Sequence, residues 1–240
     1  MLGDTWAADT WAALADLVLP TECAGCAAGR TRLRYGVCET CVASVQRLRA
    51  HEVRPQPAPA GLPRCVALGA YDGVLRQLLL AYKERGRHGL ARPLGRLLGR
   101  TVAAAAGPDR PVLLVPVPTT AAAVRARHGD HLARLLRHAV AELRSTGRPV
   151  AVAKPLRARP RPDSSALDSD GRFAAAEGAF ARRRVGLDIG RDRDPRRCVV
   201  VVDDIITTGA TLSTVSRLLS TAGVPVQAVA VLAATRRRHR

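Results

Sequence analysis

The chain has 240 residues, of which 47% are hydrophobic and 3% aromatic, and its formal net charge is +18. This length is enough for one medium-sized domain with its own core and a small additional module. No apolar run approaches the ~20 residues that span a bilayer, and the first residues lack the basic start of a secretory signal. We therefore expect a cytoplasmic protein that has no membrane partner.

The positive charge has two interpretations. A basic surface favours partners that carry phosphate, such as nucleic acid. However, almost all of this charge comes from arginine in a chain that is also rich in alanine, which is the bias that a genome rich in G and C produces. The few aromatic side chains supply little surface on which single-stranded bases could stack. Composition alone leaves both interpretations open.

Residues 1–50 are expected to form an N-terminal helix and a cysteine module. Apolar side chains recur at helical spacing from Trp6 to Leu19, and Pro20 ends the pattern. Two Cys-x-x-Cys pairs follow, with eleven residues between them: Cys23, Cys26, Cys38 and Cys41. This doubled spacing predicts a closed, structural Zn²⁺ site of the zinc-ribbon kind. Disulfides or a redox dithiol are the alternatives, and a cytosolic location disfavours stable disulfides.

A Pro-rich spacer at residues 51–63 is expected to connect this module to the main domain, residues 64–235. The first patterns of that domain predict one strand and two helices, at 65–70, 74–82 and 90–105. Lys83 continues the first helical pattern, where a solvated position and a part in a ligand site are equally compatible with the sequence. The two remaining cysteines, Cys65 and Cys198, are predicted to be buried apolar residues.

The second half of the chain alternates between strand and helix patterns. The run PVLLVPVP at 111–118 predicts the first strand of the core. Three further elements are predicted around the central motif that follows it, a helix at 130–144 and strands at 150–153 and 226–232. The polar, Arg-rich segment 154–184 is predicted to be a lid, because long loops in compact domains are often functional. The basic tail, residues 236–240, is expected to be solvated.

The most informative stretch is residues 198–212, CVVVVDDIITTGATL. Its valine run predicts a strand that is buried on both faces, as in a parallel sheet. Asp203 and Asp204 then lie at the carboxyl end of the strand, where open α/β sheets bind ligands. The glycine turn that follows leads into a helix at 211–221, and the unpaired N–H groups of a first helical turn attract anions. Two carboxylates beside an anion site indicate a ribose phosphate.

Three other interpretations of this stretch are weaker. A Walker B element would require a Gly-rich loop that ends in Gly-Lys-Ser/Thr, and neither lysine of the chain, Lys83 or Lys154, lies in one. The acidic pair of a receiver domain normally comes near the start of the chain and is followed by a lysine, whereas no lysine follows Asp204. A purely structural turn would not explain why two charges end a buried strand.

Residues 198–212 resemble the motif with which type I phosphoribosyltransferases bind PRPP (5-phosphoribosyl 1-diphosphate). The resemblance implies that Asp203 and Asp204 bind the ribose hydroxyls and stabilise positive charge on the ribose. It implies that the 5′-phosphate is held by the turn, which comprises Thr207, Thr208, Gly209, Ala210 and Thr211. The loop after the strand at 111–118 would bind pyrophosphate through Pro118, Thr119 and Thr120, with Mg²⁺ bridging pyrophosphate and ribose. The basic residues implied for the pyrophosphate are Arg125, Arg127 and one of Arg157, Arg159 or Arg161.

The chain as a whole is similar to the ComF family of competence-associated, phosphoribosyltransferase-like proteins. The shared features are the cysteine pairs, the segment YDGVLRQLLLAYKERG at 71–86, the Val-Pro-Val-Pro end of the strand at 115–118, and the PRPP motif. Two stretches, 127–131 and 163–167, depart from the usual family pattern. The resemblance implies an α/β fold, with a type I phosphoribosyltransferase-like parallel sheet flanked by helices and a small N-terminal zinc-ribbon module with four cysteine ligands.

Two functions follow from this resemblance. The first is a phosphoribosyltransferase that uses PRPP and an unknown acceptor. The second is a non-catalytic competence factor in DNA uptake, whose partners would be single-stranded DNA and a helicase.

Overall fold

The computed structural model describes residues 22–29, 32–159, 178–183, 194 and 196–235. The predicted helix at 6–19, the basic tail and the middle of the predicted lid lie outside these residues. Within the described part, no helix is long and apolar enough to cross a membrane.

A six-stranded sheet forms the centre of the molecule, in the order β3-β4-β10-β9-β5-β6. Its strands are β3 (His51–Val53), β4 (Arg64–Ala70), β5 (Val112–Pro116), β6 (Val150–Val152), β9 (Cys198–Ile206) and β10 (Ala228–Ala234). All neighbouring strands are parallel except β3, which pairs antiparallel with β4 at the edge. Val200, Val201 and Val202 of β9 are fully buried, as the valine run predicts for a parallel strand covered on both faces.

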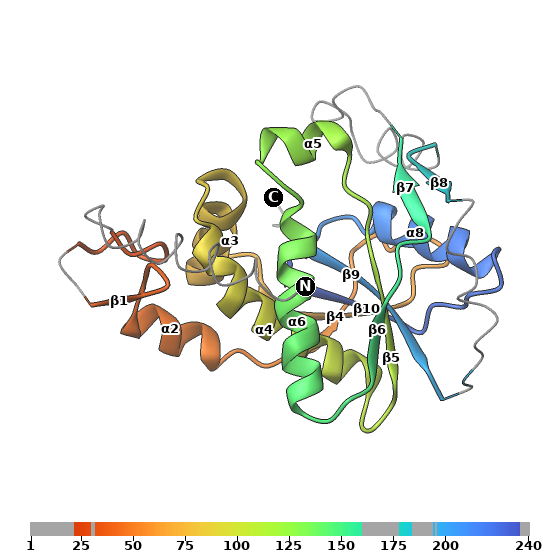
Figure 1. Ribbon diagram of the computed structural model, residues 1–240, viewed down its shortest axis with the longest axis horizontal. Helices are drawn as coiled ribbons and strands as arrows, with labels where there is room; N and C mark the ends of the chain where they lie inside the picture. Colours follow the sequence, from red (N-terminus) through yellow and green to blue (C-terminus); the bar gives the residue numbers. More distant parts are fainter. Residues whose placement is uncertain (1–21, 30–31, 160–177, 184–193, 195, 236–240) are drawn as a thin grey trace, which may run out of the picture.

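Helices cover both faces of this sheet (Figure 1). One face carries α3 (Gly73–Glu84), the 3₁₀ turn η1 (His88–Leu90), α4 (Ala91–Ala106) and α6 (His131–Ser145), and the opposite face carries α8 (Ala210–Ser220). A short helix, α5 (Ala121–Ala126), follows β5. The predicted fold class, a parallel α/β sheet flanked by helices with a four-cysteine module near the N-terminus, is confirmed.

Helices α4 and α6 pack very closely because two glycines of α4 face the α6 backbone. A Cβ atom at Gly95 would lie 2.5 Å from the Leu135 carbonyl oxygen, and one at Gly99 would lie 2.9 Å from that of Ala139. Real Cβ atoms do not approach so closely, so glycine at both positions sets the distance between the helices.

The cysteine module consists of a short hairpin and one helix, at the end of the molecule away from β5 and β6 (Figure 1). Strands β1 (Leu33–Arg34) and β2 (Val37–Cys38) pair antiparallel, and α2 (Glu39–Gln46) follows at once. The module packs against α3 through Gly25, where a Cβ would lie 2.8 Å from Cys41 Sγ and 3.0 Å from Val74 Cγ1. Gly25 therefore leaves no room for a side chain between the module and the domain.

Two sequence-based expectations need correction. The strand at 111–118 is not the first strand of the core, because β4 precedes it and lies inside the sheet between β3 and β10. The segment 154–184 is not wholly a loop: its described ends form a two-stranded ribbon of β7 (Leu156–Ala158) and β8 (Phe180–Arg182). Cys65 and Cys198 are buried, with 2% and 1% exposure, as predicted.

The Pro-rich segment 51–63 does more than connect two parts of the chain. Its first residues form β3, and its later residues contact the start of α8. Ser213 Oγ donates a hydrogen bond to the Ala60 carbonyl at 2.7 Å. Pro55 and Leu62 lie against Gly209, where a Cβ would be 3.3 Å and 3.0 Å from their side chains. This segment thus supports the turn that follows β9.

Candidate functional site

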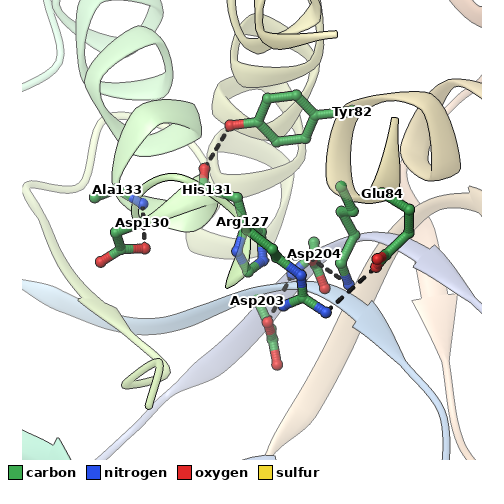
Figure 2. A network of polar contacts seen from close by, with 9 residues as sticks. Tyr82, Glu84, Arg127, Asp130, His131, Ala133, Asp203 and Asp204 are labelled. Carbon is green, nitrogen blue, oxygen red and sulfur yellow. Dashed lines mark hydrogen bonds and ion pairs between the residues drawn. The ribbon is translucent and has the colours of Figure 1, made fainter. Parts of the chain in front are cut away.

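The acidic pair lies in the last four residues of β9, which extends to Ile206. Adjacent side chains of a strand point to opposite faces of the sheet, and the two carboxylates accordingly have different surroundings. Asp204 is buried, with 4% exposure, whereas Asp203 is partly exposed. Figure 2 shows Asp204 on the side of His131 and Asp203 pointing away from it.

Asp204 is held by side chains from two helices. Its Oδ2 atom lies 2.9 Å from Lys83 Nζ on α3 and 2.8 Å from His131 Nε2 on α6. The Tyr82 hydroxyl donates to the main-chain carbonyl of His131 at 2.6 Å (Figure 2), which ties α3 to α6. The buried carboxylate therefore connects β9 to both helices, through partners that are themselves mostly buried.

These surroundings shift the two carboxyl groups in opposite directions. Burial would raise the pKa of Asp204, but the hydrogen bond from His131 and the charge of Lys83 hold the pKa of this carboxyl below its usual range. Burial and the neighbouring Asp204 charge raise the pKa of Asp203 to about 8. Asp203 Oδ1 accepts a hydrogen bond from the Asp204 N–H at 2.9 Å. Asp204 is thus a fixed anion, while Asp203 is the carboxyl group available to a ligand.

His131 is the first residue of α6 and is 7% exposed. Because the ionised Asp204 carboxylate accepts a hydrogen bond, Nε2 of His131 carries the proton between them. The other ring nitrogen, Nδ1, is buried and has no hydrogen-bond partner among the described residues. Within the described part of the chain, the ring therefore hydrogen-bonds only to Asp204.

The turn after β9 leads directly into α8. Gly209 has φ +77°, a left-handed conformation that favours glycine, and it is the N-cap residue of α8. The first N–H groups of a helix have no intrahelical partner. In this turn, the Thr208 Oγ1 atom accepts a long hydrogen bond of 3.4 Å from the Ala210 N–H. Thr207, Thr208 and Thr211 are not buried, so the turn presents hydroxyl and N–H donors at the edge of the sheet.

The loop after β5 lies beside the acidic pair. Pro116 of β5 pairs with Val202, and the Val117 N–H donates to the Val202 carbonyl at 3.0 Å. Pro118, Thr119 and Thr120 follow, and the Thr120 side chain caps α5 by accepting from the Ala123 N–H at 3.2 Å. The loop predicted for pyrophosphate and the turn predicted for the 5′-phosphate therefore lie at one edge of the sheet.

The predicted basic residues are only partly brought together. Arg125 is on α5, and Arg127 follows it and forms an ion pair with Glu84 of α3 at 3.3 Å. Arg157 lies in β7, Arg159 follows it, and Arg161 is outside the described residues. Arg127 is partly exposed and its partner Glu84 more so, so this ion pair leaves the guanidinium accessible.

The four cysteines of the N-terminal module form a cluster. Their Sγ atoms lie within 4.8 Å of one another, and those of Cys26 and Cys38 are 3.8 Å apart. Four sulfurs bound tetrahedrally to zinc at about 2.3 Å would be about 3.8 Å apart. Cys23 Sγ accepts hydrogen bonds from the N–H groups of Gly25 and Cys38, at 3.4 Å and 3.2 Å. Such donors favour thiolates, so the cluster suits a metal ion such as Zn²⁺.

The sequence leaves Lys83 open between a solvated position and a ligand site, and it does not single out Glu84 or His131. One signal for Lys83 was available: it is one of two lysines in a chain whose other basic residues are arginine or histidine. Glu84 lies in the shared segment 71–86 and His131 in the divergent stretch 127–131, but neither stretch identifies a partner that lies on another element.

No family model and no curated protein matches the chain. Among solved structures, it is similar to hypoxanthine phosphoribosyltransferases. The enzyme from Staphylococcus aureus is 11% identical, with a TM-score of 0.34, over 62% of this chain and 68% of that one. The enzyme from Trypanosoma cruzi is 15% identical, with a TM-score of 0.35, over the same shares.

Proposed function

We propose that the sheet edge formed by the ends of β9 and β5 binds PRPP, and that the chain is a phosphoribosyltransferase-like protein of the ComF kind. One observation carries this proposal. The available carboxyl group of Asp203, the glycine turn before α8 and the loop after β5 lie side by side at the carboxyl ends of neighbouring parallel strands. This edge is where open α/β sheets bind ligands.

Each part of PRPP has a matching group at this edge. The 5′-phosphate lies against the N–H groups and hydroxyls at 207–211, because the start of a helix favours an anion. Asp203 accepts hydrogen bonds from the ribose hydroxyls, and Asp204 orients the site through Lys83 and His131. Pyrophosphate lies against Pro118 and Thr119, with Arg125 and Arg127 supplying positive charge. Mg²⁺ bound together with PRPP would neutralise part of the charge of the pyrophosphate.

Calorimetry with PRPP and Mg²⁺ tests this site. Above the raised pKa of Asp203, at about pH 9, wild-type protein should bind, and Asp203→Asn should bind about tenfold or more weakly, since it loses a charge-assisted hydrogen bond of about 1.5–3 kcal/mol. Asp109→Asn is the matched control, because Asp109 is exposed in the turn before β5 at the opposite end of the sheet. Heat that is absent in all three proteins, or equal in all three, removes the proposal.

Turnover requires an acceptor whose nucleophile forms a bond to the anomeric carbon while the bond from that carbon to pyrophosphate breaks. A screen of nucleobases for PRPP-dependent release of pyrophosphate identifies such an acceptor. Binding of PRPP without release by any acceptor would favour a protein that senses PRPP.

The ComF resemblance implies a second function, binding of single-stranded DNA during DNA uptake together with a helicase, and the net charge of +18 is compatible with contacts to its phosphates. Phosphate contacts make such binding strongly dependent on salt. A steep salt dependence combined with weak PRPP binding would support this function over the first.

A further inference from the structure

A groove lies between the cysteine module and α4, and none of the residues of the proposed PRPP site lines it. It consists of two adjoining hollows of about 140 Å³ and 290 Å³ that share Gln46, Leu97 and Arg100 in their walls. Val45 of α2 and Leu97 of α4 form part of an apolar floor that continues to Leu68. The groove is therefore open, elongated and apolar at its base.

Arginines surround this apolar floor. Arg34, Arg92, Arg96 and Arg100 are exposed and line the first hollow. The guanidinium groups of Arg34 and Arg92 lie over the ring of Tyr35, at 5.8 Å and 5.6 Å from its centre. Among the described residues, only Glu142 forms ion pairs with this rim, at 3.6 Å to Arg96 and 3.1 Å to Arg100. The rim keeps an excess of positive charge, which suits an acidic, apolar partner.

The N-terminal segment, residues 1–20, has this chemistry. It carries Asp4, Asp9 and Asp16 and no lysine or arginine, in a chain whose net charge is +18. Its pattern predicts an amphipathic helix with Trp11, Leu14 and Val18 on one side. An acidic segment with one apolar side matches an apolar groove with a basic rim.

The described chain begins at Glu22, which lies next to the groove and closely follows this segment in sequence. The main-chain carbonyl of Glu22 accepts a hydrogen bond from Arg87 Nη1 at 2.8 Å, and the same nitrogen lies 3.4 Å from the carbonyl oxygen of Gly36. Gly36 is flanked by Tyr35 and Val37, which both line the groove. A segment tethered this close has a high effective concentration at the groove, so it outcompetes free partners of similar chemistry.

We propose that residues 1–20 dock as an amphipathic helix in the groove between α2 and α4 and so clamp the cysteine module to the main domain. The apolar side of the segment covers the floor, and the negative charge of the segment is attracted to the arginine rim. This interaction is independent of the proposed PRPP site.

Tryptophan fluorescence tests this proposal directly, since Trp6 and Trp11 are the two tryptophans of the whole chain. The variant Trp6→Phe leaves Trp11 as a single reporter. Docking predicts emission shifted to the blue and weak quenching by acrylamide. Solvent-exposed emission from this variant in an otherwise folded protein overturns the proposal.

Two changes should release the segment. Arg34→Glu with Arg92→Glu reverses charge on the rim, and Leu14→Ser with Val18→Ser makes the apolar side polar. Each pair, in the Trp6→Phe background, should shift emission to the red and increase acrylamide quenching several-fold. Arg144→Glu, an exposed arginine near the end of α6, is the control and should change neither. If neither pair of substitutions changes the emission or the quenching, docking in this groove is contradicted.

Dilution distinguishes this arrangement from pairing with a second copy. Emission of the Trp6→Phe variant should stay constant over about a hundredfold dilution, because docking within one chain does not depend on concentration. A red shift on dilution, with a matching change of mass in sedimentation, would show that a second copy supplies the segment.

Discussion

The two aspartates at the end of β9 are adjacent in sequence, but the pKa values of their carboxyl groups are shifted in opposite directions. Asp204 is a buried anion between Lys83 and His131, whereas Asp203 is partly exposed and has a raised pKa. Carboxyl groups whose surroundings separate their pKa values in this way are typical of functional sites. Their roles should therefore be separable by substitution.

Removing the lysine tests the role of Asp204. We expect Lys83→Met to lower the free energy of unfolding at pH 7 by about 2–3 kcal/mol, because it leaves a buried carboxylate with one fewer partner. Lys154→Met is the matched control, since Lys154 is exposed and forms no described ion pair, and it should have almost no effect. Chemical denaturation of the three proteins measures the difference.

The effect of Lys83→Met on the free energy of unfolding should depend on pH in a definite direction. The pKa of Asp204 is lower in the folded protein than the unfolded value of about 3.9, so its stabilisation is complete above pH ~5 and is lost at lower pH. The difference in the free energy of unfolding between wild type and Lys83→Met should therefore decrease as the pH falls from about 5 to about 2. A gap that does not change with pH would contradict the ion pair.

The contribution of Asp203 to stability has the opposite dependence on pH. Its pKa in the folded protein is raised to about 8, so ionisation destabilises the fold as the pH rises from the unfolded pKa towards this value. Asp203→Asn keeps Oδ1 as an acceptor and removes the charge. Because water reaches part of this carboxyl group, we expect a gain of about 1–2 kcal/mol at pH 8 and less at pH 4.

Thermal unfolding at the two pH values measures this gain, with Asp109→Asn as the control for an exposed carboxylate. A variant that is more stable and yet fails to bind PRPP would identify Asp203 as a functional residue. A loss of stability at pH 8 would show that the charge supports the fold.

At this scale, the sequence locates the acidic pair and the glycine turn because they are contiguous and have a recognisable order of residue types. It does not locate Lys83 or His131, because their contacts with Asp204 depend on how α3 and α6 cross the sheet. Such contacts between distant elements have no local pattern.

The long elements are predicted close to their observed bounds. The patterns at 90–105 and 130–144 correspond to α4 and α6, with ends that differ by one residue. The short elements β3, α5, β7 and β8 are missed, since three to six residues are too few to show a period. The close contact of α4 with α6 is also missed, because a glycine in a helical pattern does not identify its neighbour.

The close contact between α4 and α6 predicts the effect of a substitution at Gly95. A Cβ at Gly95 would collide with the Leu135 main chain, so Gly95→Ala should force the helices apart. We expect a net loss of about 1–2 kcal/mol, because a clash with main chain places the overpacking cost at about 2–3 kcal/mol, which exceeds the gain of about 1 kcal/mol in helix propensity. Chemical denaturation measures it.

Gly29→Ala is the control, because nothing lies within 4 Å of a Cβ there and its φ is not positive. It should leave stability nearly unchanged. Equal effects of the two substitutions would contradict the close packing of α4 on α6.

The cysteine cluster gives a second prediction at this scale. Purified protein should contain about one zinc ion per chain, and Cys26→Ser should lower this content and make the module sensitive to chelators, since structural zinc contributes folding energy. Cys65→Ala is the control, because Cys65 is buried outside the cluster. Metal analysis of the purified proteins measures the zinc content. Full zinc content in Cys26→Ser would contradict the proposed ligand set.

At the scale of the whole molecule, the sheet order brings the ends of β5 and β9 together although many residues separate them in the chain. The valine-rich patterns predict parallel strands but not their order, because register and neighbours depend on packing throughout the core. The same is true of the Pro-rich segment 51–63, whose contacts with Gly209 and Ser213 support the proposed phosphate turn from outside the motif.

The most direct test of the account is a crystal structure of the protein soaked with PRPP and Mg²⁺. We expect the 5′-phosphate against the N–H groups of residues 207–211, the ribose hydroxyls on Asp203, and Lys83 still on Asp204. PRPP bound elsewhere, or side chains filling this edge of the sheet in its place, would contradict the account.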